Sequence, residues 1–443
     1  MQSFVVLYLS NICDIIAQGD GSRLKPGKGA LLCMQTSKDT NPPESTSNFT
    51  LILFTSAALA LLLIIRIALF EYESFDYVHS LSRWVAAFRG MTFFEGLGAK
   101  VGNYNAPYMY ILNIIARIGL PDLYLIKTVS ILFDIMVAYF AMKLVSLRTE
   151  RVHLQILAFI LAFAIPTVVL NSSMWAQCDS IYAAFALGSV YFAYRGRSKT
   201  AYALIALALS FKFQAAFMLP VLAVFVITGK IRFKDCYMLF AVYFATLLPA
   251  IIAGAPIADL LQVYAAQIGT YDYLTLNAIN IWQLVGIVDF SSFVTAGLFT
   301  CALAILSLLY FIYVNRERLT KTVDFIRLTY LFVVIAPFLL PKMHDRFFYM
   351  ADVLSLVVFL FDKRRWYVPV VTILCSYTVY AWFLMEWTTL FDYRLAALAL
   401  MTVIIIVLRD FVVSLSARRE GRHGGHKEDG SCDDQEDSPA DCE

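Results

Sequence analysis

The sequence predicts an all-α polytopic membrane protein with about 12 transmembrane helices and a long first extracytoplasmic loop. Of its 443 residues, 60% are hydrophobic and 15% are charged, whereas soluble domains are about 45–50% apolar and about 25% charged. The 35 Lys+Arg and 33 Asp+Glu residues give a formal net charge of +2, so no basic excess predicts nucleic-acid binding. Composition therefore excludes a soluble enzyme, a disordered chain and a nucleic-acid-coating protein.

Twelve apolar segments are predicted to cross the bilayer, whose core needs roughly 20 apolar residues in a helix. They are 51–70, 123–146, 153–170, 179–194, 200–211, 214–228, 236–253, 292–313, 325–340, 347–361, 367–385 and 395–413. The fifth and sixth are short and are separated by Lys212. Such short helices are tolerated where they pack inside protein or border a wet cavity.

Basic residues predict the orientation of these helices. Alternate loops are basic and belong in the cytosol by the positive-inside rule; their residues are Arg148, Arg151, Arg195, Arg197, Lys199, Lys230, Arg232, Lys234, Arg316, Arg318, Lys321, Lys363, Arg364 and Arg365. Twelve spans then place both termini in the cytosol. We expect residues 1–49 to be a disordered leader, 50–415 the transmembrane domain and 416–443 a disordered charged tail, with Met34 an alternative start.

The opposite loops carry acids, amides and aromatic residues. They comprise 71–122, 171–180, the turn at Lys212, 254–291, 340–349 and 385–394. Because polar groups at membrane depth are costly, their collection on one side predicts a shared water-filled cavity. The alternative is an interfacial aromatic belt with ordinary polar loop residues.

The first of these loops begins with carboxylates, among them Glu73 and Asp76. A carboxylate that is ionised near neutral pH can take a proton from an attacking sugar hydroxyl. Asp76 is the preferred base because it lies in a helix-like stretch in which Tyr77, Ser80 and Trp84 are spaced for neighbouring faces. Its alternative role is a helix cap or an arginine partner. Glu73 could share the site or a metal, but the outer loops contain no D-x-D, so no metal or other cofactor is indicated.

Phosphate leaving groups need cationic stabilisation, and Lys342, His344 and Arg346 fall within five residues of one outer loop. This cluster is the best candidate for a phosphate site. The alternative is an internal pair with Asp345 or Asp352.

Two charged residues lie among apolar segments. Lys212 should meet an anion there, unless it extends to the interface. Asp134 is predicted to tie helices together by hydrogen bonds rather than to take part in the chemistry.

Several segments resemble the GT-C membrane glycosyltransferases, specifically bacterial proteins related to the GPI mannosyltransferase that adds the second mannose. The similar pieces are ESFDY (73–77), YNAPY (104–108), WAQCDSIYAAF (175–185), ALALSFKFQAAFMLP (206–220), LNAINIWQL (276–284) and LPKMHDRFFYMADVLSL (340–356). They occur in order along the chain. YNAPY departs from the family with Ala106 where its members usually have proline, and the acidic pair that the family often shows in the first loop is here spaced as Glu73 and Asp76.

The resemblance implies a GT-C-like enzyme that transfers a sugar, mannose by analogy, from a polyprenyl-phosphate donor to a glycolipid or glycan acceptor on the extracytoplasmic face. Asp76 then carries the base role, and the role of Glu73 is open. We expect donor phosphate contacts from Lys342, His344, Arg346 and Lys212, and substrate contacts from Tyr104, Asn105, Trp175, Gln177, Asp179, Gln214, Asn277 and Asn280.

The expected membrane is the bacterial plasma membrane, or the endoplasmic reticulum in a eukaryote. Two other classes of protein compete with a transferase. A transporter or flippase predicts inverted repeats and a midplane polar site, and we find no convincing repeat. A non-catalytic scaffold does not require Asp76, Lys212 and the residues 342–346 to converge.

Overall fold

The computed structural model is helical and describes residues 44–269, 272–286, 290–386 and 390–424. The chain divides into two units, Met1–Ser56 and Ala57–Glu443. The predicted disordered segments fall largely outside the described residues, which begin with α2 at Glu44 and end with α19 at Gly424. The polar residues whose contacts are described below, from Arg66 to Tyr380, belong to the second unit.

The first half of the chain contains helices of very different length. In order they are α2 (Glu44–Ala68), π-helix η1 (Tyr77–Leu81), α3 (Ser82–Arg89), α4 (Phe93–Gly98), α5 (Ala106–Ile115), α6 (Asp122–Ser146), α7 (Val152–Ala164), α8 (Pro166–Ser173), α9 (Asp179–Tyr194), α10 (Ser198–Phe211), 3-10 helix η2 (Phe213–Met218) and α11 (Leu219–Ile227). The predicted long first loop is therefore largely helical, and Asp76 directly precedes η1 with helical backbone angles, as its helix-like spacing predicts.

The second half adds one small sheet. Its elements are η3 (Phe233–Cys236), α12 (Tyr237–Ile252), α13 (Ile257–Ile268), β1 (Thr275–Leu276), α14 (Trp282–Val285), α15 (Phe290–Val314), η4 (Arg316–Arg318), α16 (Thr322–Leu339), β2 (Met343–His344), α17 (Tyr349–Phe361), η5 (Lys363–Arg365), α18 (Tyr367–Met385) and α19 (Tyr393–Gly424). Strands β1 and β2 pair in parallel, with Thr275 opposite Met343, and so join two predicted outer loops.

In the part of the chain that the structure describes, seven helices are long and apolar enough to cross a membrane, and the bent pair α7–α8 makes an eighth candidate. These eight agree with eight of the predicted segments. The protein is therefore a multi-span helical membrane protein. The other four segments also form helices, but α10 and α17 have only 14 and 13 residues. At 1.5 Å per residue such helices fall short of a bilayer core about 30 Å thick.

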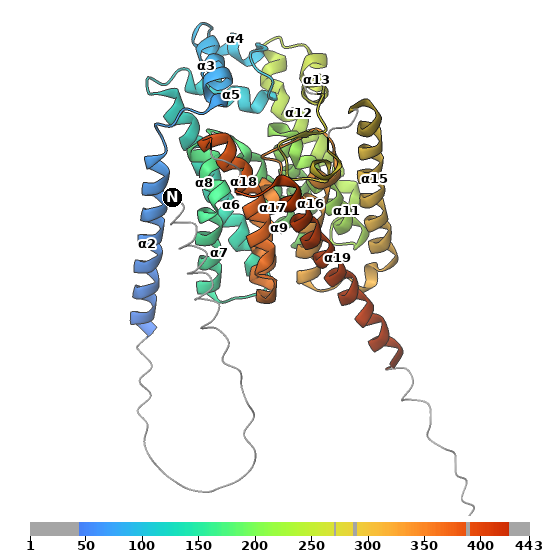
Figure 1. Ribbon diagram of the computed structural model, residues 1–443. Helices are drawn as coiled ribbons and strands as arrows, with labels where there is room; N and C mark the ends of the chain where they lie inside the picture. Colours follow the sequence, from blue (N-terminus) through green and yellow to red (C-terminus); the bar gives the residue numbers. More distant parts are fainter. Residues whose placement is uncertain (1–43, 270–271, 287–289, 387–389, 425–443) are drawn as a thin grey trace, which may run out of the picture. The chain divides into compact units, whose positions relative to one another are not determined.

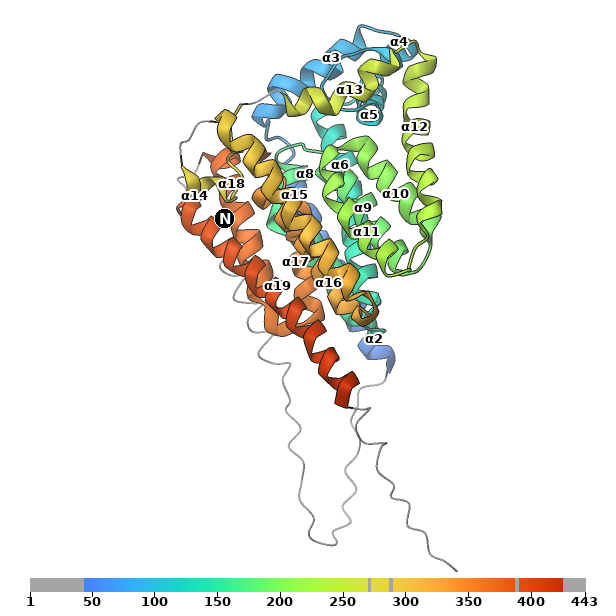
Figure 2. The same cartoon turned by 90° about the vertical axis from the view of Figure 1, so that its right-hand side faces the viewer.

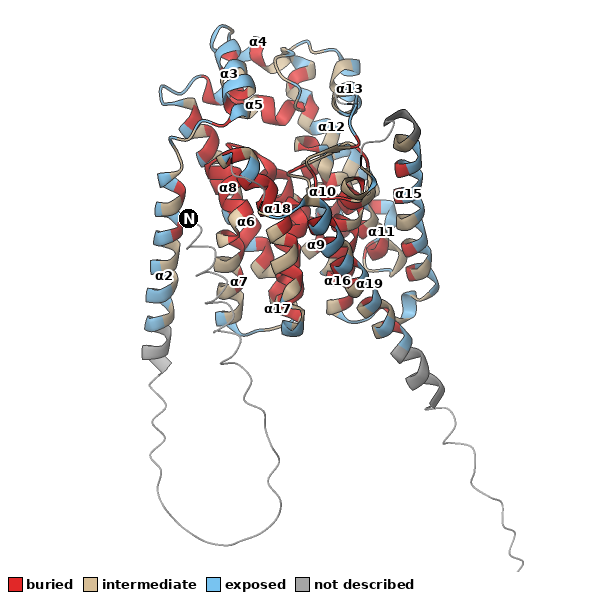
Figure 3. Cartoon of the chain, in the orientation of Figure 1, coloured by how far each residue is buried: buried red, intermediate tan, exposed pale blue. Residues whose placement is uncertain are grey.

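Burial explains how the short helices persist. In the second unit, α3, α4, α5 and α13 lie together beyond one end of the long helices (Figures 1 and 2). Buried residues concentrate in the helices beneath them, including α8, α16 and α17 (Figure 3). The span Thr322–Leu339 is 83% buried, whereas Phe293–Val314 is 22% buried and presents most of its apolar surface outward, as a lipid-facing helix does.

Candidate functional site

The segment that leads to Asp76 is held in place by two buried polar side chains. After α2 ends, Lys127 Nζ donates to the carbonyl oxygens of Leu69, Phe70 and Tyr72 at 2.9, 2.8 and 2.7 Å. The ammonium thus replaces water for backbone acceptors that no helix satisfies. Ser74 Oγ donates to the Trp175 carbonyl at 2.7 Å, so the start of η1 is held against the 175–179 segment.

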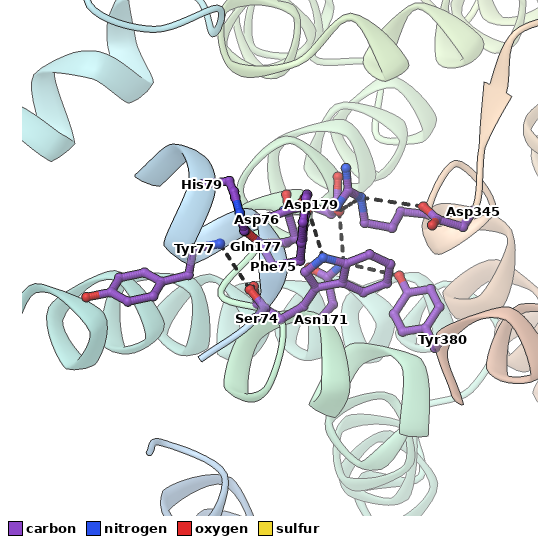
Figure 4. A network of polar contacts seen from close by, with 12 residues as sticks. Ser74, Phe75, Asp76, Tyr77, His79, Asn171, Gln177, Asp179, Asp345 and Tyr380 are labelled. Atoms are coloured by element: carbon purple, nitrogen blue, oxygen red, sulfur yellow. Dashed lines mark hydrogen bonds and ion pairs between the residues drawn. The ribbon is translucent and has the colours of Figure 1, made fainter. Parts of the chain in front are cut away.

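Asp76 receives three donors on one oxygen. Its Oδ2 accepts from Trp175 Nε1 at 2.9 Å, from Gln177 Nε2 at 2.7 Å and from Arg346 Nη1 at 2.6 Å. Within the described part of the chain, Oδ1 accepts no hydrogen bond, and the side chain is 29% exposed. Figure 4 shows Asp76 together with Gln177 and Asp179 in this network. One oxygen is therefore held in place and the other is available.

The charge state of Asp76 follows from these contacts. Burial acts to raise the pKa of the carboxyl, but the Arg346 charge and the hydrogen bonds from Arg346 and Trp175 outweigh it, and the pKa lies below its ordinary value. Asp76 is therefore a carboxylate at neutral pH. Since the three donors meet on Oδ2, the free Oδ1 carries an unshared lone pair that can accept a proton.

An unusual backbone conformation lets two neighbours reach the same carboxylate. Ala176 has φ of +62°, in the left-handed region, between Trp175 and Gln177. This conformation costs a residue with a Cβ of order 1 kcal/mol or more and persists where the surroundings impose it. Here the backbone N–H of Trp175 donates to the carbonyl oxygen of Leu170, and that of Gln177 donates to the carbonyl oxygen of Asn171, near the end of α8. Strain is thus located where the site is assembled.

A second, more deeply buried ion pair, Asp179–Lys212, belongs to the same polar network as Asp76. Asp179 accepts from Lys212 Nζ on Oδ1 at 2.6 Å and from Asn171 Nδ2 on Oδ2 at 2.8 Å. The side chains of Asp179 and Lys212 are 1% and 3% exposed, so the prediction that Lys212 meets an anion is confirmed, and the anion is Asp179. Asn171 also donates to the Tyr380 hydroxyl at 3.1 Å.

Arg346 lies close to both Asp76 and Asp179. Its guanidinium stacks over the Trp175 ring at 4.7 Å, while its Nε lies 3.9 Å from both Asp179 Oδ2 and Asp345 Oδ1. At that distance neither carboxylate accepts a hydrogen bond, and among the described residues Nε and Asp345 Oδ1 are both buried without a hydrogen-bond partner. Buried charges attract Arg346 from two sides, but its short ion pair is with Asp76.

The other two cations of the 342–346 cluster lie differently. Lys342 has φ of +61°, and its Nζ contacts Ile268 O at 3.1 Å and Asp272 Oδ1 at 3.4 Å, in the 254–291 loop. His344 pairs through β2 with Leu276 and bridges Asn277. Burial, together with the charges of Arg346 and Lys212, lowers the pKa of His344 to about 4, so its imidazole is neutral at pH 7.

The remaining predicted site residues divide into near and distant groups. Tyr104 OH donates to Gln177 Oε1 at 3.3 Å, and Lys212 Nζ lies 5.3 Å from its ring centre. Asn280 is buried, and its Nδ2 has no hydrogen-bond partner among the residues that the structure describes. Asn105 instead caps α5 and donates to the Tyr243 and Tyr264 hydroxyls. The structure gives no contact of Glu73, which is exposed, or of Gln214, which is half-buried, with Asp76.

Aromatic side chains border the exposed edge of the site. Phe75 is 63% exposed and stacks on His79 with ring centres 3.9 Å apart, and Figure 4 places both beside Asp76. On the buried side, Trp175 stacks on Phe383 at 4.5 Å. The carboxylate therefore lies between an exposed aromatic pair and a second pair formed by buried Trp175 and half-buried Phe383.

Sequence reasoning missed Asn171, Lys127 and Tyr380 as supports of the site. Asn171 lies in one of the polar outer loops, at 171–180. Lys127 and Tyr380 are single polar residues in apolar helices, and no sequence spacing distinguishes them. Among the described residues, no group of three or more His, Cys, Asp and Glu side chains is placed to hold a metal ion. No family model matches the chain, and no curated protein matches it.

Proposed function

We propose that the protein is a membrane glycosyltransferase of GT-C-like architecture with about 12 spans. It transfers a sugar, mannose by analogy, from a polyprenyl-phosphate donor to a glycolipid or glycan acceptor. The observation that supports this best is the arrangement of hydrogen bonds at the Asp76 carboxylate. Its Oδ2 accepts from Trp175, Gln177 and Arg346, whereas within the described residues its Oδ1 accepts no hydrogen bond. A base and a cation then share one partly exposed site.

The chemistry needs these two groups side by side. An acceptor hydroxyl forms a bond from its oxygen to the anomeric carbon and gives its proton to Asp76 Oδ1. The bond from that carbon to the phosphate oxygen breaks, and its electron pair leaves with the polyprenyl phosphate. One negative charge thus moves from Asp76 to the phosphate. Arg346, 2.6 Å from Asp76, is placed to stabilise the developing anion.

The positions of the residues in the chain suit a lipid-linked donor. Asp76 follows the span Phe49–Ala68, the 175–179 segment follows the bent pair, and Arg346 follows the span Thr322–Leu339. Alternate basic loops assign these segments to the non-cytosolic side and both termini to the cytosol. A donor that enters sideways from the bilayer and an acceptor that arrives from the aqueous side can meet there. A bacterial plasma membrane fits this arrangement, as does the endoplasmic reticulum in a eukaryote.

The decisive experiment is transfer by purified protein in liposomes. Radiolabelled polyprenyl-phosphate sugars are supplied with a lipid extract as acceptor, and labelled glycolipid is measured. Wild-type protein and Asp235→Asn should transfer label, because Asp235 is buried against Arg232, apart from the site. Asp76→Asn should not.

If no donor supports transfer while the same liposomes move a labelled lipid or polar solute across the bilayer, the protein belongs to the transporter or flippase class. This result would overturn the proposal.

A further inference from the structure

Two buried polar atoms of the site face each other without bonding. Arg346 Nε and Asp345 Oδ1 are 3.9 Å apart, and among the described residues each lacks a hydrogen-bond partner. A buried polar atom without a partner destabilises the fold, because it has lost its hydrogen bonds to water and gained none in return. Two such atoms of opposite charge on adjacent residues indicate a contact that forms in another state of the site.

The competing pull comes from Asp76. Arg346 Nη1 holds Asp76 Oδ2 at 2.6 Å, and the guanidinium stacks on Trp175, so its plane is restrained. A shift of about 1 Å would bring Nε within hydrogen-bond distance of Asp345. The guanidinium makes this shift only when the attraction of Asp76 weakens, because in the present state the nearer carboxylate holds it.

We propose that Asp345 is a positioning residue that receives Arg346 when Asp76 takes up a proton. The inference rests on the proposed function, in which Asp76 changes from carboxylate to neutral acid. Arg346 then loses its short ion pair and forms a hydrogen bond through Nε to Asp345, while Nη1 and Nη2 stay directed toward the departing phosphate. Within the described residues Nη2 has no hydrogen-bond acceptor. The N–H groups of Nη2 are therefore free to donate to the phosphate.

Asp345 also limits how tightly Arg346 binds Asp76 beforehand. Its carboxylate and that of Asp179 lie at equal distance from Nε, and they draw the guanidinium away from Asp76. Without Asp345, Arg346 attracts the Asp76 charge without competition from that side. Asp76 then becomes a weaker base, because a carboxylate that pairs more strongly with a cation takes up a proton less readily.

A stability cycle tests the exchange of partners without an activity assay. Thermal midpoints in detergent at pH 7.5 are compared for wild type, Asp345→Asn, Asp76→Asn and the double variant, with Asp76→Asn mimicking the protonated base. In wild type, Asp345→Asn should leave the midpoint unchanged or raise it, since burial disfavours the charge of Asp345. In the Asp76→Asn background it should lower the midpoint by about 2 °C or more.

The essential result is that Asp345→Asn lowers the midpoint only in the Asp76→Asn background. Equal effects of Asp345→Asn in the two backgrounds would show that Arg346 never turns to Asp345, and would overturn the inference. Asp235 is a buried carboxylate that pairs with Arg232 at 3.0 Å. Asp235→Asn therefore serves as the matched control and should shift the thermal midpoint equally in both backgrounds.

Kinetics give a second test. Asp345→Asn should lower kcat about 10-fold with little change in donor KM, move the acid limb of the pH–rate profile to lower pH, and be partly rescued by Asp345→Glu. An unchanged acid limb, or a loss confined to KM, would contradict the positioning role. If wild-type protein transfers no sugar, the proposed function fails, and the stability cycle still decides whether Arg346 exchanges its partners.

Discussion

Two of the protein's arginine–aspartate pairs are built from similar parts, but one is fully buried and the other reaches the surface. Arg66 Nη1 binds Asp134 Oδ2 at 2.8 Å with both side chains fully buried, and its guanidinium lies 4.0 Å from the Phe163 ring centre. Arg346 binds Asp76 Oδ2 at 2.6 Å and stacks on Trp175 at 4.7 Å, but Asp76 is 29% exposed. The two pairs contain the same chemical groups and differ in their exposure to solvent.

The difference lies in how the carboxylate oxygens are used. Both oxygens of Asp134 are occupied, Oδ2 by Arg66 and Ser172 and Oδ1 by the Tyr349 hydroxyl at 3.2 Å. Asp76 concentrates its donors on one oxygen. A saturated buried pair ties helices together, and an unsaturated pair at a surface can exchange a proton. The prediction that Asp134 links helices by hydrogen bonds is confirmed.

The largest expected effect is on catalysis through the Arg346–Asp76 pair. Asp76→Asn keeps a hydrogen-bond acceptor for Trp175 but removes the proton acceptor, so the transfer rate should fall by about 10³-fold. The thermal midpoint should change by no more than about 3 °C, since the pair is partly exposed. Radiolabel transfer and differential scanning fluorimetry measure the two quantities. Full activity in this variant would remove the base assignment.

The buried Arg66–Asp134 pair should respond in the opposite way. Asp134→Asn leaves the Arg66 charge buried without a counter-ion, which should destabilise the fold by about 3–5 kcal/mol. Protein that remains folded should transfer sugar at the wild-type rate. Replacing both partners, Arg66→Met with Asp134→Leu, should recover part of the stability. If Asp134→Asn lost activity at unchanged stability, the contrast between the pairs would be wrong.

A smaller effect distinguishes the cations of the 342–346 cluster. Arg346→Gln removes the charge beside Asp76 and should lower kcat/KM for the donor about 10²-fold. Lys342→Met should stay within about 3-fold, because Lys342 faces Asp272, whose side chain is 80% exposed. Donor titrations of both variants measure the ratio. An equal loss in the two variants would restore Lys342 to the phosphate site that its sequence position predicts.

Much of the scaffold could be predicted from sequence, because a lipid environment imposes long apolar helices whatever their partners. The short helices could not be assigned as reliably, since α17 is apolar because it is buried in protein. In the site, residue types were predictable and pairings were not. Asp76 and Arg346 are 270 positions apart, and no pattern in the sequence predicts the left-handed Ala176 or the three carbonyls that Lys127 binds.

The smallest predicted effect concerns His344, which tests whether the cation cluster contains two charges or three at neutral pH. Burial first, then the Arg346 and Lys212 charges, lower its pKa to about 4 from an ordinary value near 6.5. Between these values the unfolded chain binds a proton that the folded protein does not. This group therefore makes the protein more stable as pH rises from about 4 to about 6.5.

The His344→Gln variant should lose that part of the pH dependence. Its thermal midpoint, measured between pH 4.5 and 7, should rise less steeply with pH than that of the wild type, and transfer activity above pH 6 should keep its profile. Asp345 has the opposite slope, since burial raises its pKa to about 6, so the comparison is best made in the Asp345→Asn background. A steeper slope without His344 would mean that the imidazole is charged beside Arg346, and that the site holds one more cation for the phosphate.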